Sequence, residues 1–159
     1  MNADQVYVIG VDGGTESIRV GLFDLNGNLK ASRHHPYQTY FTQSGWAEQD
    51  PEEWWTMVCK AIEKVKIATN VSRTQIKGIG ISYQMHGLVT VDKAGKVLRP
   101  AIIWCDSRAV EIGDQAAASI GPETCLKNLL NMPGNFTASK LKWVKDNEPE
   151  LYSQIHKIM

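Results

Sequence analysis

Residues 6–24 constrain the fold more than any other stretch, because they hold two apolar runs joined by a pair of glycines. Residues 6–11 form the first run, and residues 18–22 alternate apolar side chains with small or charged ones. Short runs of this kind, bounded by turn residues, are typical of β-strands. Gly13 and Gly14 permit a tight reversal that a side chain would obstruct. The stretch therefore predicts a β-hairpin.

The loop of this hairpin gathers groups that suit an anionic ligand. Asp12, Thr15 and Ser17 stand beside the bare backbone amides of Gly13 and Gly14. Amides and hydroxyls bind phosphate oxygens, and a carboxylate beside them suits a hydrated Mg²⁺ ion. The loop is not a P-loop, because the Gly-Lys-Ser/Thr ending is absent. The pattern also fits an ordinary glycine turn that carries one aspartate, and the hairpin alone does not separate the two interpretations.

The residues after the hairpin predict a third strand and a helix. Asn26-Gly27 is a strong two-residue turn signal, and a strand over residues 29–40 would complete an antiparallel meander. Residues 45–50 are polar and predict a loop. Asp50 and Pro51 favour the start of a helix. The apolar face of this helix would consist of residues at helical spacing: Trp55, Val58, Ile62 and Val65.

The second half of the chain continues the alternation of strands and helices, which predicts an α/β fold. Residues 76–82 predict a buried strand, which follows a helix and should therefore pair in parallel with an earlier strand. A hairpin around residues 92–95 and a helix over residues 109–120 come next. Thr137 is expected to cap a helix that extends to Lys145.

The last residues, 155–159, predict a strand that is only beginning. Natural termini usually leave an element complete. We therefore expect the chain to be truncated, that is, part of a longer protein.

Composition and charge exclude several classes of partner. The chain has 17 basic and 17 acidic residues, so its formal net charge is zero, which argues against a nucleic-acid or membrane-surface role. The three cysteines show no CxxC pairing and are odd in number, which favours a reducing compartment. No stretch reaches the length of a membrane span. We expect a cytoplasmic protein.

Two further groups of polar residues are candidates for a binding site. Gln84 and His86 follow the strand at 76–82, and in open α/β sheets ligands bind outside the carboxyl ends of the strands. An amide and an imidazole can both bind hydroxyl groups. Asp106 and Arg108 form the other group. Ordinary structural interpretations stay open: a loop with a satisfied histidine, and a local ion pair that contributes about 0–1 kcal/mol if it is exposed.

Six motifs, in order along nearly the whole chain, resemble those of the FGGY family of carbohydrate kinases. They are Gly10-Val-Asp-Gly-Gly-Thr15 with Arg19, Gly45-Trp-Ala-Glu-Gln-Asp-Pro-Glu-Glu-Trp-Trp55, Gln84-Met-His-Gly87, Leu98-Arg-Pro-Ala-Ile-Ile-Trp104, Asp106-Ser-Arg108 and Met132-Pro-Gly-Asn-Phe-Thr-Ala-Ser-Lys140. Six matches in sequence make a chance resemblance implausible. The Gln-Met-His-Gly form is similar to that of the xylulokinases within the family.

The resemblance implies an actin/hexokinase-like (ribonuclease H-like) fold, with a mixed sheet, helices on both faces, and two domains that enclose ATP and sugar. Residues 1–159 would be the N-terminal part of the first domain, and the second domain would be absent from this chain. The implied activity is the ATP- and Mg²⁺-dependent phosphorylation of a ketopentose, with D-xylulose the first choice. The partner would be a small-molecule sugar, and a homodimer is possible.

The same resemblance assigns roles to residues of the hairpin. The counterpart of Asp12 attends Mg²⁺ and the transferring phosphate, so it is both the catalytic and the metal-binding candidate. Gly13, Gly14 and Thr15 would line the phosphate path, and Arg19 would reach the same phosphates.

The sugar-binding candidates come from the second and third groups. Met85 and His86 fall where xylulokinases contact the sugar, and Gln84 belongs to the same motif. Trp104 and Asp106 are expected nearby.

Parts of the family's active site would lie beyond residue 159. These are the general base, an aspartate in the later half of the first domain, and most adenine contacts, which come from the second domain. We therefore expect the 159-residue chain alone to be inactive. Two other interpretations stay open: a non-catalytic sugar-binding module, and an FGGY kinase for another sugar or polyol, such as L-ribulose, L-fuculose, gluconate or glycerol.

Overall fold

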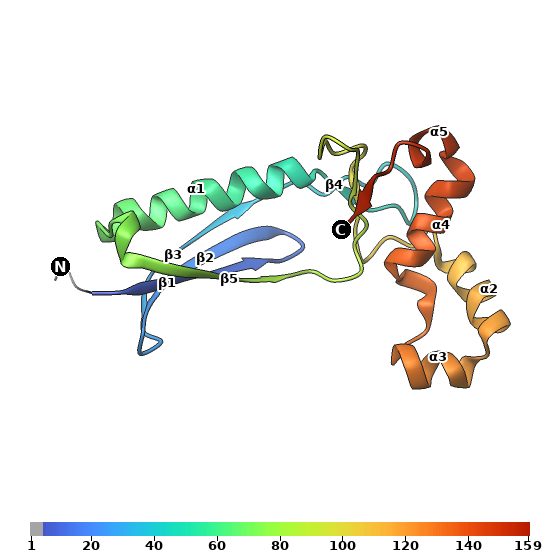
Figure 1. Cartoon of the computed structure of the whole chain (residues 1–159), viewed down its shortest axis with the longest axis horizontal. Coiled ribbons are helices and arrows are strands. Elements are labelled where there is room, and N and C mark those ends of the chain that lie inside the picture. The colour runs from blue at the N-terminus through green and yellow to red at the C-terminus, as the bar shows by residue number, and fades with distance from the viewer. Residues whose placement is uncertain (1–4) are drawn as a thin grey trace. The chain divides into compact units, whose positions relative to one another are not determined.

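The structure, a computed structural model, describes residues 5–159 and divides the chain into two compact units (Figure 1). Unit 1 comprises the residues up to Gln38 together with Glu52–Gln84. Unit 2 comprises Thr39–Pro51 and Met85–Met159. Each unit has a hydrophobic core of its own.

Unit 1 is built on a four-stranded mixed sheet with the strand order β3-β2-β1-β5. The strands are β1 Tyr7–Gly13, β2 Ser17–Asp24, β3 Leu29–Pro36 and β5 Ile76–Tyr83. β2 is antiparallel to both β1 and β3, whereas β5 is parallel to β1. The predicted hairpin, meander and parallel pair are therefore confirmed, although the third strand ends at Pro36 and not at residue 40.

Helix α1, Pro51–Thr69, runs along one face of this sheet (Figure 1). It begins at Pro51, as predicted from the fixed φ of proline. Its fully buried residues pack against the sheet in one core, which consists of Ala61 and Val65 with Tyr7, Ile9, Val11, Ile18, Val20, Leu22 and Val71. Within residues 5–159, unit 1 contains no second α-helix, so the helical layer expected on the other face is not part of this unit.

The predicted apolar face of α1 is wrong at Trp55, whose side chain is 66% exposed. The buried Ala61 marks the inward direction, and Trp55 precedes it by six residues, which places Trp55 about 120° away around the helix. Trp54 precedes Ala61 by about two full turns, and its ring centroid lies 6.5 Å from that of Tyr37. The other expected residues are buried or packed against the core: Val58, Ile62 and Val65.

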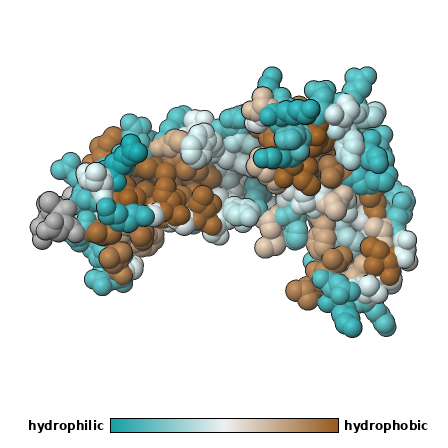
Figure 2. All heavy atoms as spheres, in the orientation of Figure 1, coloured by the Kyte–Doolittle hydropathy of each residue, from teal (hydrophilic) through white to brown (hydrophobic). Residues whose placement is uncertain are grey.

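Strand β5 is not the buried strand that its apolar sequence predicts. It forms one edge of the sheet, and Ile79, Ile81 and Tyr83 are 55%, 67% and 75% exposed. The reason is that the core under α1 is made by β1, β2 and β3, and among the residues of β5 only Ile76 packs against it. Figure 2 shows hydrophobic side chains gathered at the surface over the sheet of unit 1. Hydrophobicity therefore predicts this strand and its pairing but not its burial.

An exposed apolar edge strand offers unpaired backbone groups and apolar side chains to a second copy of the chain. We predict that the 159-residue chain self-associates through β5 at high concentration. Ile81→Lys should shift it towards the monomer in sedimentation velocity, because burying a charged ammonium group in the interface is unfavourable. Ile67→Lys changes an isoleucine of α1 that is 74% exposed, and this control should associate like the wild type. Equal association of wild type and Ile81→Lys would contradict the prediction.

Unit 2 combines two short strand pairs with four α-helices among the described residues. β4 Glu48–Gln49 pairs with β7 Ala101–Ile102, and β6 Thr90–Val91 pairs with β8 Lys157–Ile158. The helices are α2 Val110–Ile120, α3 Pro122–Leu129, α4 Thr137–Asn147 and α5 Pro149–Tyr152, and the short 3₁₀ turns of the chain are η1 Arg73–Gln75 in unit 1 and η2 Pro133–Asn135 in unit 2. None of the helices in residues 5–159 has the length and hydrophobicity that a transmembrane span needs.

Most elements predicted for this region are confirmed. The helix over residues 109–120 is α2, the hairpin around residues 92–95 closes with a hydrogen bond from the Gly95 amide to the Asp92 carbonyl, and the last strand is β8. Helix α3 was not predicted. It follows α2 directly, because Gly121, with a φ of 96°, ends one helix while Pro122 begins the next.

The expectation of a polar loop over residues 45–50 is wrong. Ala47, Glu48 and Gln49 are buried. Glu48 is tolerated inside because its carboxylate forms ion pairs with Arg99 and with Arg108, the latter at 2.9 Å. The sequence shows the polar residues of this segment, but it does not show that their partners lie about fifty positions further along the chain.

Candidate functional site

Asp12 lies near the carboxyl end of β1, directly across the sheet register from Arg19 on β2. Arg19 Nη1 lies 3.2 Å from Asp12 Oδ2, and the two side chains are 65% and 54% exposed. An ion pair this exposed contributes at most about 1 kcal/mol to folding. Because Val11 points into the core, the alternation of the strand turns Asp12 to the opposite face. The hairpin thus presents a carboxylate and a guanidinium side by side to solvent.

The two glycines of the loop do not have the role that the sequence suggests. The amide of Gly14 donates a hydrogen bond to the carbonyl of Ser17 at 3.2 Å, so it is not bare. Neither Gly13 nor Gly14 has a positive φ, and a Cβ on Gly14 would meet only the Ser17 carbonyl oxygen, at an ordinary 3.6 Å. The turn itself therefore does not require glycine. Gly14 supplies a surface without a side chain in the loop that follows Asp12, whereas Gly13 is covered by Ile18, Ser82 and Tyr83.

Tyr37, in the segment after β3, holds this loop, although no motif in the sequence marks it. Its hydroxyl donates a hydrogen bond to the carbonyl of Gly14, and its amide donates to the carbonyl of Glu16 at 3.2 Å. Burial, together with the negative charge of Asp12, raises the pKa of Tyr37 to about 12, so the phenol keeps the proton that it donates. The predicted meander gave one indication of this contact, because it brings the end of β3 next to the start of β2. In the structure Pro36 pairs with Ser17, so Tyr37 follows directly beside the loop.

The end of β5 also joins this loop. The amide of Gln84 donates a hydrogen bond to the carbonyl of Gly13 at 3.0 Å, and Ser82 stands next to Asp12 in the parallel register. Gln84 therefore lies with the hairpin in unit 1, whereas the rest of its motif, Met85 onwards, belongs to unit 2. Of the predicted site residues, unit 1 brings together Asp12, Gly13, Gly14, Thr15, Arg19 and Gln84.

The contacts of Tyr37 predict a specific effect on the loop. Tyr37→Phe should lower the free energy of unfolding by about 1 kcal/mol, because the Gly14 carbonyl loses its donor. Hydrogen exchange at the amides of residues 14–17 should become faster. Tyr40→Phe, at a tyrosine that is 45% exposed, is the matched control and should change neither quantity. Unchanged exchange in Tyr37→Phe would show that the hydroxyl does not order the loop.

Unit 2 contains a cavity of about 320 Å³ that includes two of the predicted sugar-binding residues. Its lining residues are His86, Trp104, Val110, Asp114, Asn131, Met132, Gly134, Asn135 and Phe136. Asp114, Asn131 and Asn135 supply polar groups that sequence analysis did not select. Nothing in their spacing marks them, because α2 and the segment around η2 become neighbours only in the folded unit. Met85 is 66% exposed and is not among the lining residues.

Close helix packing closes one wall of this cavity. A Cβ on Gly113, in α2, would lie 2.3 Å from the Cα of Gly134 in η2. Only glycine at position 113 permits this approach, since the obstructing atoms belong to the backbone. The neighbours of these two glycines, Asp114 and Asn135, therefore come to line the same cavity.

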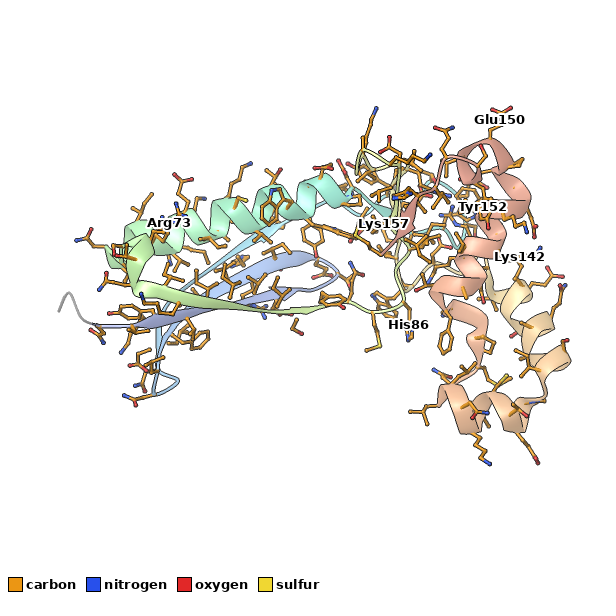
Figure 3. The ribbon with its side chains drawn as sticks, in the orientation of Figure 1. Arg73, His86, Lys142, Glu150, Tyr152 and Lys157 are labelled. Atoms are coloured by element: carbon orange, nitrogen blue, oxygen red, sulfur yellow. The ribbon has the colours of Figure 1, made fainter. Side chains whose placement is uncertain are left out.

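His86 occupies an unusual backbone conformation at the edge of the cavity, where Figure 3 labels it. Its φ is 61°, in the left-handed region that non-glycine residues rarely adopt. Its ring stacks on Phe136, with centroids 4.8 Å apart and planes 14° from parallel. The hydroxyl of Thr137 donates a hydrogen bond to the carbonyl of the next residue, Gly87, at 3.0 Å. Thr137 is thus the first residue of α4 and not its cap, because its hydroxyl is used by the His86 loop.

Lys140 is fully buried beneath this loop. Its ammonium group donates hydrogen bonds to the carbonyls of His86 at 2.7 Å and Asn135 at 2.6 Å. Burial lowers the pKa of Lys140 to about 8, while the nearby charge of Asp106 opposes the shift. The sequence marks Lys140 only as the last residue of a motif, because a lysine on a helix is usually exposed.

Asp106 is the predicted sugar-binding residue that the structure places furthest from solvent. Its side chain is fully buried, accepts a hydrogen bond from the Ala47 amide at 2.7 Å, and pairs with Arg108 at 2.7 Å. The guanidinium of Arg108 lies 3.7 Å above the ring of Trp46. The local ion pair expected for Asp106 and Arg108 is therefore confirmed, although it is buried. Asp106 has no oxygen at the surface through which to contact a sugar directly.

Comparison with known proteins places this arrangement in a family. The model of the N-terminal domain of the FGGY family of carbohydrate kinases matches residues 7–159. The xylulose kinase of Escherichia coli K12 is 36% identical over 151 residues, which are 95% of this chain and 31% of the relative.

Two solved structures from Lactobacillus acidophilus show the same fold. A gluconate kinase matches 98% of this chain with a TM-score of 0.87 and 28% identity, and a ligand-bound xylulose kinase matches 96% with a TM-score of 0.84 and 28% identity. The chain covers 31% of each of these proteins. It therefore spans about a third of the length of the proteins it matches.

Proposed function

Because the chain belongs to the FGGY family of carbohydrate kinases, we propose that it is the N-terminal part of the first domain of an ATP-dependent kinase that converts D-xylulose to D-xylulose 5-phosphate. The observation that carries this proposal is the exposed pair of Asp12 and Arg19 at the end of the hairpin. Both charges can contact a ligand from solvent, and the stability of the fold depends little on their pairing. The similarity to xylulose kinases supports the choice of sugar.

Phosphoryl transfer requires positioning and neutralisation of charge more than covalent chemistry by the protein. Arg19 can contact phosphate oxygens with a guanidinium that is always charged. The open surface at Gly14 lets a phosphate group approach the backbone closely. The Tyr37 hydroxyl holds that backbone by its hydrogen bond to the Gly14 carbonyl. In this arrangement the chain orients the transferred group and holds it still.

The residues present fit a magnesium ion bound largely through water and phosphate. Mg²⁺ usually keeps several waters and takes one or two carboxylates from the protein. Asp12 offers such a carboxylate, and residues 5–159 contain no cluster of three or more side chains that would form a closed metal cage. When bound, the ion would neutralise charge on the transferred phosphate.

The cavity of unit 2 supports the binding of a small polyhydroxylated molecule. Its polar lining residues offer amide and carboxylate groups, which pair with hydroxyls, and its aromatic residues offer flat apolar faces. His86 adds one donor or acceptor at each ring nitrogen. We assign His86 and Trp104 to direct sugar contact, with Met85 a neighbour, and Asp106 to support of the surrounding structure.

Asp12→Ala tests the phosphate site in an enzyme of full family length that contains this chain. We expect kcat to fall at least ~100-fold, as for other groups that stabilise charge in a transition state. The free energy of unfolding should change by no more than about 1 kcal/mol, because the lost ion pair is exposed. Glu16→Ala, an exposed acid in the same loop, should keep normal kcat. A kcat unchanged by Asp12→Ala would refute the assignment.

The activity itself is tested by a coupled assay of ADP release. An enzyme of full family length should prefer D-xylulose over L-ribulose, L-fuculose, gluconate and glycerol, whereas the 159-residue chain alone should show no turnover. The second result is expected because the general base and the adenine contacts of the family lie outside this chain. Preference for another compound would overturn the choice of sugar, and turnover by the chain alone would overturn the assignment of the missing groups.

A kinase for a different sugar acid or polyol is the second candidate. The gluconate kinase from Lactobacillus acidophilus matches the fold as well as the xylulose kinases do, so the fold does not decide between these substrates. The same substrate panel separates them. Binding of sugar without any turnover in the full-length enzyme would instead favour a non-catalytic binding module.

A further inference from the structure

We propose that Lys140 is a positioning residue that sets the sugar affinity of this enzyme by holding His86 in place. The inference rests on the proposed function, because it concerns the same cavity. Lys140 is not a catalytic residue in this account, since it is fully buried and is not among the cavity-lining residues. It acts through the backbone of the residues that do line the cavity.

One ammonium group ties together two walls of the cavity. Lys140 Nζ donates to the carbonyl of His86 on one side and to the carbonyl of Asn135, in η2, on the other. Both acceptors belong to residues that line the cavity. A displacement of the ammonium would therefore change the distance between the imidazole and the amide that face a bound sugar.

The conformation of His86 explains why such support is needed. A non-glycine residue with a left-handed backbone carries a strain of about 1–3 kcal/mol and persists only when its surroundings fix it. Three contacts from the start of α4 supply this constraint: Lys140 on the His86 carbonyl, Thr137 on the Gly87 carbonyl, and Phe136 stacked on the imidazole. Helix α4 and the residue that precedes it thus contact two successive carbonyls and the ring of His86.

The burial of a lysine at this point is itself unfavourable. A buried ammonium loses its hydration, and carbonyl oxygens restore only part of it. An apolar side chain of similar length would fill the same space without that loss, although it would leave both carbonyls without their donor. Burial lowers the pKa of the ammonium, Asp106 and Cys105 raise it, and Arg108 lowers it. The hydrogen bonds of the ammonium go instead to the carbonyls of His86 and Asn135.

The inference predicts a selective change in sugar binding. In an enzyme of full family length that contains this chain, Lys140→Met should raise KM for D-xylulose at least tenfold. KM for ATP should stay within twofold and kcat within threefold, since the hairpin of unit 1 is unchanged. Lys142→Met is the matched control: it lies two positions along the same helix, is exposed, and pairs with the exposed Asp146, so its kinetics should match the wild type. Figure 3 labels Lys142.

Thr137→Val provides a second test that does not disturb a buried charge. It keeps the shape of the side chain but removes the donor to the Gly87 carbonyl, so it should raise KM for the sugar in the same selective way, by about threefold or more. Because this variant loses only one hydroxyl, it should fold and report on sugar binding even if Lys140→Met does not fold.

The outcomes separate this inference from the proposed function. Loss of folded protein in Lys140→Met, together with unchanged sugar KM in Thr137→Val, would show that α4 supports the fold and not the site. Normal sugar KM in a well-folded Lys140→Met would overturn the inference directly, while a wild type active on D-xylulose would leave the proposed function standing. A wild-type enzyme inactive on every compound of the panel would overturn both.

Discussion

The register between β1 and β2 is the constraint on which the rest of this structure depends. Because side chains alternate along a strand, the pairing that buries Ile9 and Val11 under α1 also turns Asp12 to the opposite face, directly across from Arg19. A slip of one residue would bury the charges and expose the core. The hydrophobic core of unit 1 therefore fixes the position of the two charges that we assign to the phosphate.

Unit 2 differs from the hairpin because it keeps a cluster of charged side chains away from solvent. Its buried charges form a cluster in which Glu48, Asp106 and Arg108 neutralise one another, and the Trp46 ring covers the guanidinium. Such a network is costly to disrupt, because removing one partner leaves a buried charge without compensation. Lys140 is likewise a buried charge, but its partners are the backbone carbonyls of His86 and Asn135. Hydrogen bonds from a buried lysine thus tie two lining residues of the cavity together, while the hairpin charges are exposed.

The sequence was sufficient for the elements and their pairing in unit 1, since hydrophobic alternation and turn residues are local signals. It failed where burial depends on distant segments. The apolar β5 is an exposed edge, and the polar segment at residues 45–50 is buried, because only the folded chain shows what covers each of them. Among the candidate residues, motifs selected Asp12 and His86, whereas no local pattern marks Tyr37 or Asp114.

The position of the phosphate site is tested most directly by a crystal structure of an enzyme of full family length that contains this chain, with D-xylulose, Mn²⁺ and a non-hydrolysable ATP analogue bound. The anomalous signal of Mn²⁺ locates the cation without ambiguity. We expect the cation to lie beside the Asp12 carboxylate, with the terminal phosphate over residues 13–15 and within reach of Arg19. A cation and triphosphate bound away from this hairpin would contradict it.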